Sequence, residues 1–100
     1  MKKVELFTNE MHEMKETILC ELTPKEDCTV EELAWTLAED RTYQDYRQTL
    51  MLLGTCGEQI CIRYGEVGEI GDAYRNQVVK SAMAVIQPGE RAVFYTFALK

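Results

Sequence analysis

The chain has 100 residues, of which 46% are hydrophobic and 28% charged, and its formal net charge is −6. This length is that of one domain with a single core. No stretch reaches the roughly 18 uninterrupted apolar residues of a membrane span, and the residues after Met1-Lys2-Lys3 are too polar for a secretory signal. We therefore expect one cytoplasmic globular domain, residues 1–100, with no membrane partner.

The first segment carries two overlapping patterns. Apolar and polar residues alternate over Val4–Leu6 and again over Ile18–Leu22, as in half-buried strands. We favour two strands around a polar loop, because the alternation and β-branched residues occur at both ends. A helix over residues 9–22 is the alternative, since a 3-4-3-4 helical spacing is also present at Val4, Phe7, Met11, Met14 and Ile18.

A helix is expected to begin at Val30. Thr29-Val30-Glu31-Glu32 has the form of a capping box, in which the hydroxyl and the Glu carboxylate bind amides at the helix start. The apolar face of this helix would consist of Val30, Leu33, Ala34 and Leu37.

A second helical stripe is expected after a weaker cap at Thr42–Asp45. It contains Tyr43, Tyr46, Leu50 and Leu53 and ends at Gly54. The two stripes do not align on one straight helix, so we favour a break near Asp40–Thr42. The alternative is one long helix that buries opposite faces at its two ends, where Trp35 would join Tyr46 and Leu53.

The second half of the chain is expected to continue as strand, loop, helix and strand. Gln59–Tyr64 is typical of a strand, Gly65–Gly71 is a glycine-punctuated loop, and Asp72 would cap a helix that closes at Pro88-Gly89. The final strand, Arg91–Leu99, is apolar on both faces, which predicts either a central strand in a covered sheet or a subunit contact. A subunit contact would make the protein a homodimer.

These elements together predict an α+β fold. The order is β-β-α-α-β-α-β, and we expect a small mixed sheet of three to four strands with two to three helices packed on it.

The cysteines do not have the spacing of a metal site. Cys20, Cys28, Cys56 and Cys61 are expected to be reduced thiols, and they lack the close pairs through which zinc is usually bound. Nothing places the single histidine, His12, beside Cys56 as a catalytic base. We therefore predict no metal, no cofactor, no catalytic residue and no enzymatic activity.

The glycine loop carries the alternative function. Its G-x-x-G-x-x-G spacing is neither the dinucleotide nor the P-loop pattern, and Glu66, Glu69 and Asp72 would repel phosphate or form an atypical cation site. The alternative is therefore a small-molecule- or metal-binding domain that uses Gly65–Gly71 or the cysteines.

The negative charge is concentrated in the N-terminal part. Residues 1–40 contain eleven acids and four lysines, a charge of −7, whereas residues 41–100 have a charge of +1. No cluster of Lys and Arg is present for a phosphate backbone, so direct nucleic-acid binding is not expected. The better electrostatic match is another protein with a basic surface.

The residue types most common in binding hot spots gather between Trp35 and Arg47. The chain carries Trp35, Arg41, Tyr43, Tyr46 and Arg47 there, with Glu31, Glu32 and Glu39 around the tryptophan. The alternative is that Trp35 is covered by the N-terminal strands. We predict a small acidic, non-enzymatic regulatory protein that occupies a partner protein's surface through these eight residues. Phage- and mobile-element-type inhibitors that mask a basic nucleic-acid-binding site share this physical profile, although not this sequence.

Overall fold

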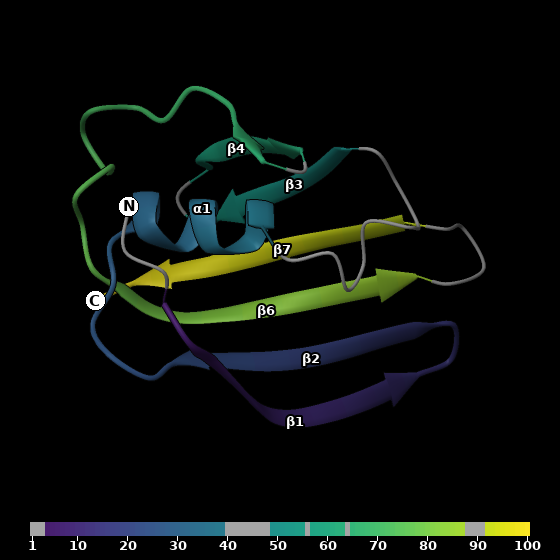
Figure 1. The fold of residues 1–100 in the computed structure, drawn as a ribbon. Coiled ribbons are helices and arrows are strands. Elements are labelled where there is room, and N and C mark those ends of the chain that lie inside the picture. The colour runs from purple at the N-terminus through teal and green to yellow at the C-terminus, as the bar shows by residue number, and fades with distance from the viewer. Residues whose placement is uncertain (1–3, 40–48, 56, 64, 88–91) are drawn as a thin grey trace.

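The computed structural model describes residues 4–39, 49–55, 57–63, 65–87 and 92–100. Its elements are β1 (Leu6–Met14), β2 (Thr17–Pro24), α1 (Val30–Glu39), β3 (Thr49–Gly54), β4 (Gln59–Arg63), β5 (Glu66–Val67), β6 (Val79–Gln87) and β7 (Ala92–Leu99). The strands form one sheet in the order β1-β2-β6-β7-β3-β4-β5 (Figure 1). All neighbouring strands are antiparallel except β3 and β7, which are parallel.

The expected α+β fold, with three to four strands and two to three helices, is wrong. The described residues contain seven strands in one sheet and a single helix. Two segments that were expected to be helical, one ending at Gly54 and one beginning after Asp72, instead supply the strands β3 and β6.

A break in register explains the error at β6. Val79 pairs with Leu99, but the next pair joins Ser81 to Ala98, so the register shifts between Val79 and Ser81. This irregularity separates the buried Val79 from the buried Ala82 by three positions, as on one face of a helix. Asp72 caps no helix: residues 72–76 form turns, and β6 begins at Val79.

At β3 the pairing of strands outweighs local preference. Thr49–Gly54 is rich in Leu and Met, which are good helix formers. In the fold this segment pairs with β4 on one side and with β7 on the other. Residues 40–48, which include the first half of the expected second helix, lie outside the described residues.

The two N-terminal strands are confirmed, and the helical alternative for residues 9–22 is wrong. β1 and β2 pair from Leu6 and Pro24 to Met14 and Thr17, with a register shift between Thr8 and Met11. The expected polar loop is therefore only the two-residue turn Lys15–Glu16. Lys15 occupies the left-handed region with φ 53, a conformation that L-residues with a Cβ rarely adopt.

The helix predicted at Val30 is confirmed together with its capping box. The Glu32 amide donates to Thr29 Oγ1 at 3.2 Å, and the Thr29 amide donates to Glu32 Oε1 at 3.0 Å. The helix ends at Glu39. One long helix is excluded, because Leu53 belongs to β3.

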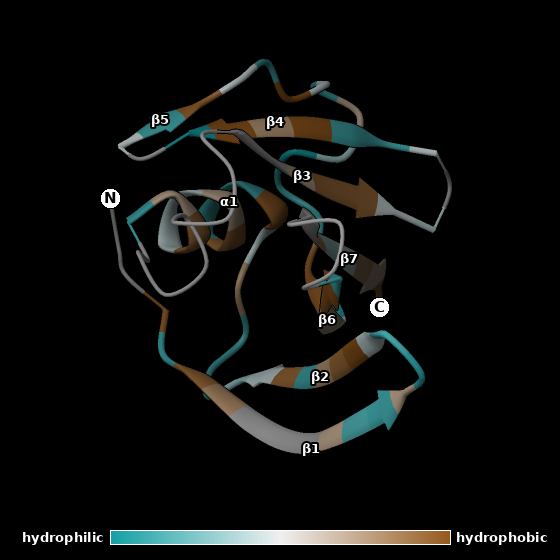
Figure 2. Ribbon diagram, turned by 90° about the vertical axis from the view of Figure 1, so that its right-hand side faces the viewer, coloured by the Kyte–Doolittle hydropathy of each residue, from teal (hydrophilic) through white to brown (hydrophobic). Residues whose placement is uncertain are grey.

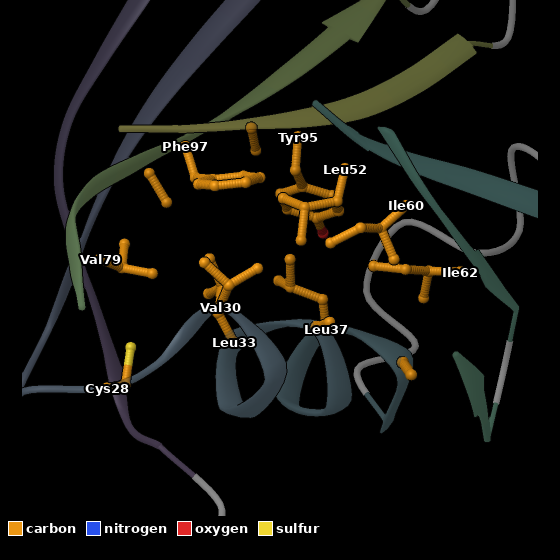
Figure 3. Packing of buried hydrophobic residues seen from close by; sticks show 14 of the residues in the cluster. Cys28, Val30, Leu33, Leu37, Leu52, Ile60, Ile62, Val79, Tyr95 and Phe97 are labelled. Carbon is orange, nitrogen blue, oxygen red and sulfur yellow. The ribbon is translucent and has the colours of Figure 1, made fainter. Parts of the chain in front are cut away.

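The core fills the space between α1 and the concave face of the curved sheet (Figure 2). Leu33 and Leu37 point from the helix toward Tyr95 and Phe97 on β7 (Figure 3). The opposite face of β7 is half-buried at Phe94, Thr96 and Ala98. β7 is thus a central strand with the helix over one face, as one of the two interpretations of its apolar pattern predicted. No described helix is both long and apolar enough to cross a membrane.

Candidate functional site

The structure brings together only half of the predicted partner-binding residues. Glu31, Glu32, Trp35 and Glu39 lie on α1, where 100° per residue places them on one side, away from the Leu33–Leu37 face. The other four, Arg41, Tyr43, Tyr46 and Arg47, lie outside the described residues.

Two of the acids on α1 have structural tasks. Glu32 closes the capping box, and Glu31 Oε2 lies 3.3 Å from Arg75 Nε in a partly exposed ion pair. Trp35 is half-buried and packs against the core. Its position is therefore intermediate between an open binding residue and a covered one. Glu39 is exposed. The helix therefore presents less of an open binding surface than its sequence predicted.

The start of α1 also offers no ready site for an anion. Its first amides all have acceptors: Val30 N donates to Gln77 O at 3.1 Å, Glu31 N to Arg75 O at 3.2 Å, and Leu33 N to Thr29 O at 3.0 Å. The Glu32 amide is bound by Thr29 Oγ1. Anion binding at a helix start needs amides that are still available to the ligand.

Large apolar side chains are exposed on β1, where no binding residue was predicted. Phe7 is 51% exposed, and Met11 and Met14 are each 61% exposed. A signal for Phe7 was present in the favoured two-strand interpretation, because Phe7 is out of phase with Val4 and Leu6, which alternate toward the core. The helical alternative obscured it by placing Phe7, Met11 and Met14 in one buried stripe with Val4 and Ile18.

The surroundings of these side chains are acidic. Between Leu6 and Pro24 the chain carries four acids (Glu10, Glu13, Glu16 and Glu21) and one base (Lys15), a formal charge of −3. Glu13 and Glu16 are exposed. At the start of the strand, Lys25 Nζ lies 2.9 Å from Glu5 Oε2 and 5.5 Å from the centre of the Phe7 ring. Exposed apolar area bordered by charge is typical of protein-binding surfaces.

The groups named in the alternative function have other positions. Cys20 and Cys28 are buried in the core and Cys61 is exposed, while Cys56 lies outside the described residues. The Gly65–Gly71 segment contains the edge strand β5 and the buried Ile70, so it belongs to the packed fold. Within the described ranges, no group of three or more His, Cys, Asp or Glu side chains is arranged to hold a metal ion.

The hollows lined by described residues include two that could hold a small molecule. One, of about 320 Å³, involves β2, β6 and β7, and its lining includes Glu21, Thr23, Ser81 and Thr96. The other, of about 250 Å³, is lined by Cys61, Arg63, Glu66 and Gly68 and touches the glycine loop. Ligand pockets usually converge on a few polar groups inside an apolar cleft of 300–1,000 Å³, roughly. Neither hollow contains a buried charged or catalytic group.

Comparisons with known protein families, with curated proteins and with solved structures gave no match to this chain.

Proposed function

We propose that this protein is a non-enzymatic binding protein that occupies the surface of another protein. The observation that carries the proposal is the exposure of Phe7, Met11 and Met14 on the acidic hairpin that β1 and β2 form (Leu6–Pro24). Apolar side chains supply contact area that is removed from water on binding. Exposed acids around them would guide the encounter with a basic surface and disfavour acidic ones.

The sign of the charge also indicates the kind of partner. A surface that is complementary to this hairpin is basic, and basic surfaces in cells are commonly those that bind nucleic acids. We therefore propose regulation of a nucleic-acid-handling protein by occupation of its basic site. This matches the physical profile of phage- and mobile-element-type inhibitors.

A capture experiment tests the proposal. The tagged protein is incubated with a nuclease-treated lysate, and enriched proteins are identified by mass spectrometry at two salt concentrations. We expect a basic protein whose capture weakens as salt rises. Capture that gives no specific protein, or a protein that is retained equally at high salt, contradicts the proposal.

A pair of charge-reversal variants tests whether the partner binds at the hairpin. Glu13→Lys/Glu16→Lys changes two exposed acids of the hairpin, whereas Glu66→Lys/Glu69→Lys makes the same charge change at the far end of the sheet. Glu31 and Glu32 are unsuitable for this test because both have structural tasks. We expect the first variant to reduce capture at least tenfold more than the second. Equal losses would show that overall charge, not the hairpin, determines binding.

Self-association is a second proposal, supported by the sheet face opposite α1. The strand pairing places Phe94 on that face beside Met51 and Val85. Phe94 and Met51 are half-buried. Light scattering at micromolar concentration should give a dimer, and Phe94→Lys should give a monomer. A monomeric mass for the unaltered protein would contradict this proposal and leave the first one intact.

A further inference from the structure

The exposed apolar residues lie on a strand at the end of the sheet, which has no strand at its outer edge within the part of the chain that the structure describes. β1 is at the end of the sheet order, and its nine residues pair only with β2 among the described strands. The outer row of backbone N–H and C=O groups of such a strand is available to another extended chain. Figure 2 shows β1 at the end of the curved sheet, on the far side of β2 from β6.

The three apolar side chains are divided between the two faces of β1. Met11 pairs with Cys20, which is buried in the core, so Met11 belongs to the concave face. Phe7 pairs with Thr23 and Met14 with Thr17, and these positions belong to the opposite face because strand residues alternate. A flat partner surface could contact one of these faces but not both.

An added strand contacts both faces at once. Side chains of an extended segment point alternately to the two faces of the sheet. Consecutive side chains of the added segment would therefore contact Met11 on one face and Phe7 or Met14 on the other. Backbone hydrogen bonds supply the affinity in this kind of recognition, and the alternating side chains supply the specificity.

We propose that the outer edge of β1 binds an extended basic segment of the partner protein as an eighth strand of the sheet. This inference rests on the proposed function and specifies its site and mode. Charge complementarity determines the occupant. The hairpin carries −3, so pairing β1 with β1 of a second copy would bring two such charges together, whereas a lysine- or arginine-bearing segment neutralises them.

The register shift between Thr8 and Met11 limits the length of the added strand. A bulge locally disrupts a strand's edge and increases its twist. Beyond the shift, β1 pairs with β2 without interruption from Met11 to Met14, a stretch that includes the exposed Glu13. We expect this part to bind most of the segment, with Phe7 as a separate contact beyond the bulge.

A defined peptide tests the mode of binding on the full chain. The probe is a decapeptide of alternating lysine and valine, and its control has proline in place of each valine. The control keeps all five positive charges but lacks the alternate amide donors and the conformation that a strand requires. We expect the probe to bind and to slow amide hydrogen exchange in β1 but not in β5. Equal binding of both peptides, no binding of the probe, or protection confined to other strands would overturn the proposal.

A matched pair of variants tests the side chains. Met11→Ser/Met14→Ser removes the two most exposed of the large apolar side chains that the structure describes, and Gln59→Ser/Asn76→Ser is the control at exposed positions elsewhere. Burial of a methionine side chain corresponds to about a tenfold change in affinity or more. We expect the first variant to weaken probe binding at least tenfold and the control to leave it unchanged. Equal affinities for all three proteins would overturn the role of the two methionines.

The same variants separate this inference from the proposed function. If the partner from the lysate depends on Glu13 and Glu16 but is captured equally by Met11→Ser/Met14→Ser, and the probe gives no protection in β1, strand addition fails while the binding function stands. If neither the lysate nor the probe gives a complex, both proposals fail. Protection of β1 in the absence of any peptide, together with a dimeric mass, would identify a second copy as the occupant and overturn the proposed basic segment.

Discussion

The two edges of the sheet are built in opposite ways. β5 has two residues, and the chain around it is fixed at both ends: Gly65 N donates to Ala38 O of the helix at 2.8 Å, and Gly68 N donates to Cys61 O at 2.7 Å. β1 has nine residues, with Phe7, Met11 and Met14 largely exposed. Short edge strands are one of the devices by which proteins prevent unwanted pairing, and bulges and charges are others.

The fold itself closes the β5 edge but not the β1 edge. The β5 edge is short and bonded to the helix, whereas the protection that the described residues give the β1 edge is a register shift and acidic side chains. Acidic side chains repel other acidic chains but not basic ones. The protection at β1 is therefore selective.

The largest effect is expected at the closed edge. Ile62 is fully buried and pairs with Val67 of β5. Ile62→Ala leaves a cavity there and should lower the free energy of unfolding by about 2–5 kcal/mol, measured by urea denaturation. A loss below about 1 kcal/mol would show that the β4–β5 edge is less tightly packed than its burial indicates.

The next effect distinguishes the acids of the helix from those of the hairpin. Glu32→Lys removes the carboxylate from the capping box and puts a positive charge at the positive end of α1. The free energy of unfolding should therefore fall by about 1–2 kcal/mol. Glu16→Lys, at an exposed turn position, should change stability by less than about 0.5 kcal/mol. If the two variants are equally stable, the capping carboxylate contributes nothing measurable.

A smaller effect of opposite sign is expected at the hairpin turn. Lys15→Gly relieves the left-handed conformation of Lys15 and should stabilise the protein by about 0.5–1 kcal/mol. Lys15→Ala is the control, since it removes the same charge but keeps the Cβ. Equal stability of the two variants would attribute any gain to charge and not to backbone conformation.

The smallest effect on stability is expected at the open edge. Met11→Ser/Met14→Ser removes side chains that are each 61% exposed and should change the free energy of unfolding by less than about 0.5 kcal/mol. This variant tests binding cleanly only if it remains folded, which circular dichroism and the denaturation midpoint will show. A loss above about 1 kcal/mol would mean that these methionines pack against the fold in solution.

The sequence predicted the elements whose signals are local. The capping box at Thr29 marked the start of α1, and the alternation over Ile18–Leu22 marked β2. The helices expected at β3 and β6 are wrong because the contacts that decide these strands are distant: Leu52 pairs with Tyr95, and Val79 with Leu99. Ala82 and Ala84 have high helix propensity, but in the fold they are buried on the concave face of β6.

The candidate site was harder to predict for the same reason. Trp35 has a residue type that is common in binding hot spots, but the structure packs part of it against the core. Phe7, Met11 and Met14 resemble core residues in composition, and only the position of β1 at the end of the sheet leaves them exposed. Strand order depends on contacts far apart in the chain, so no local pattern around Met11 reveals it.

The place of β7 in the sheet has a consequence for synthesis of the protein. β7 follows the other six strands along the chain, yet it is the only described link between the β1-β2-β6 group and the β3-β4-β5 group. The parallel pair of Met51 and Phe94 cannot form until Phe94, which lies 43 residues further along the chain, has been synthesised. Such long-range pairing slows folding. On the ribosome, the seven-stranded sheet therefore cannot be complete until residues 92–99 have emerged.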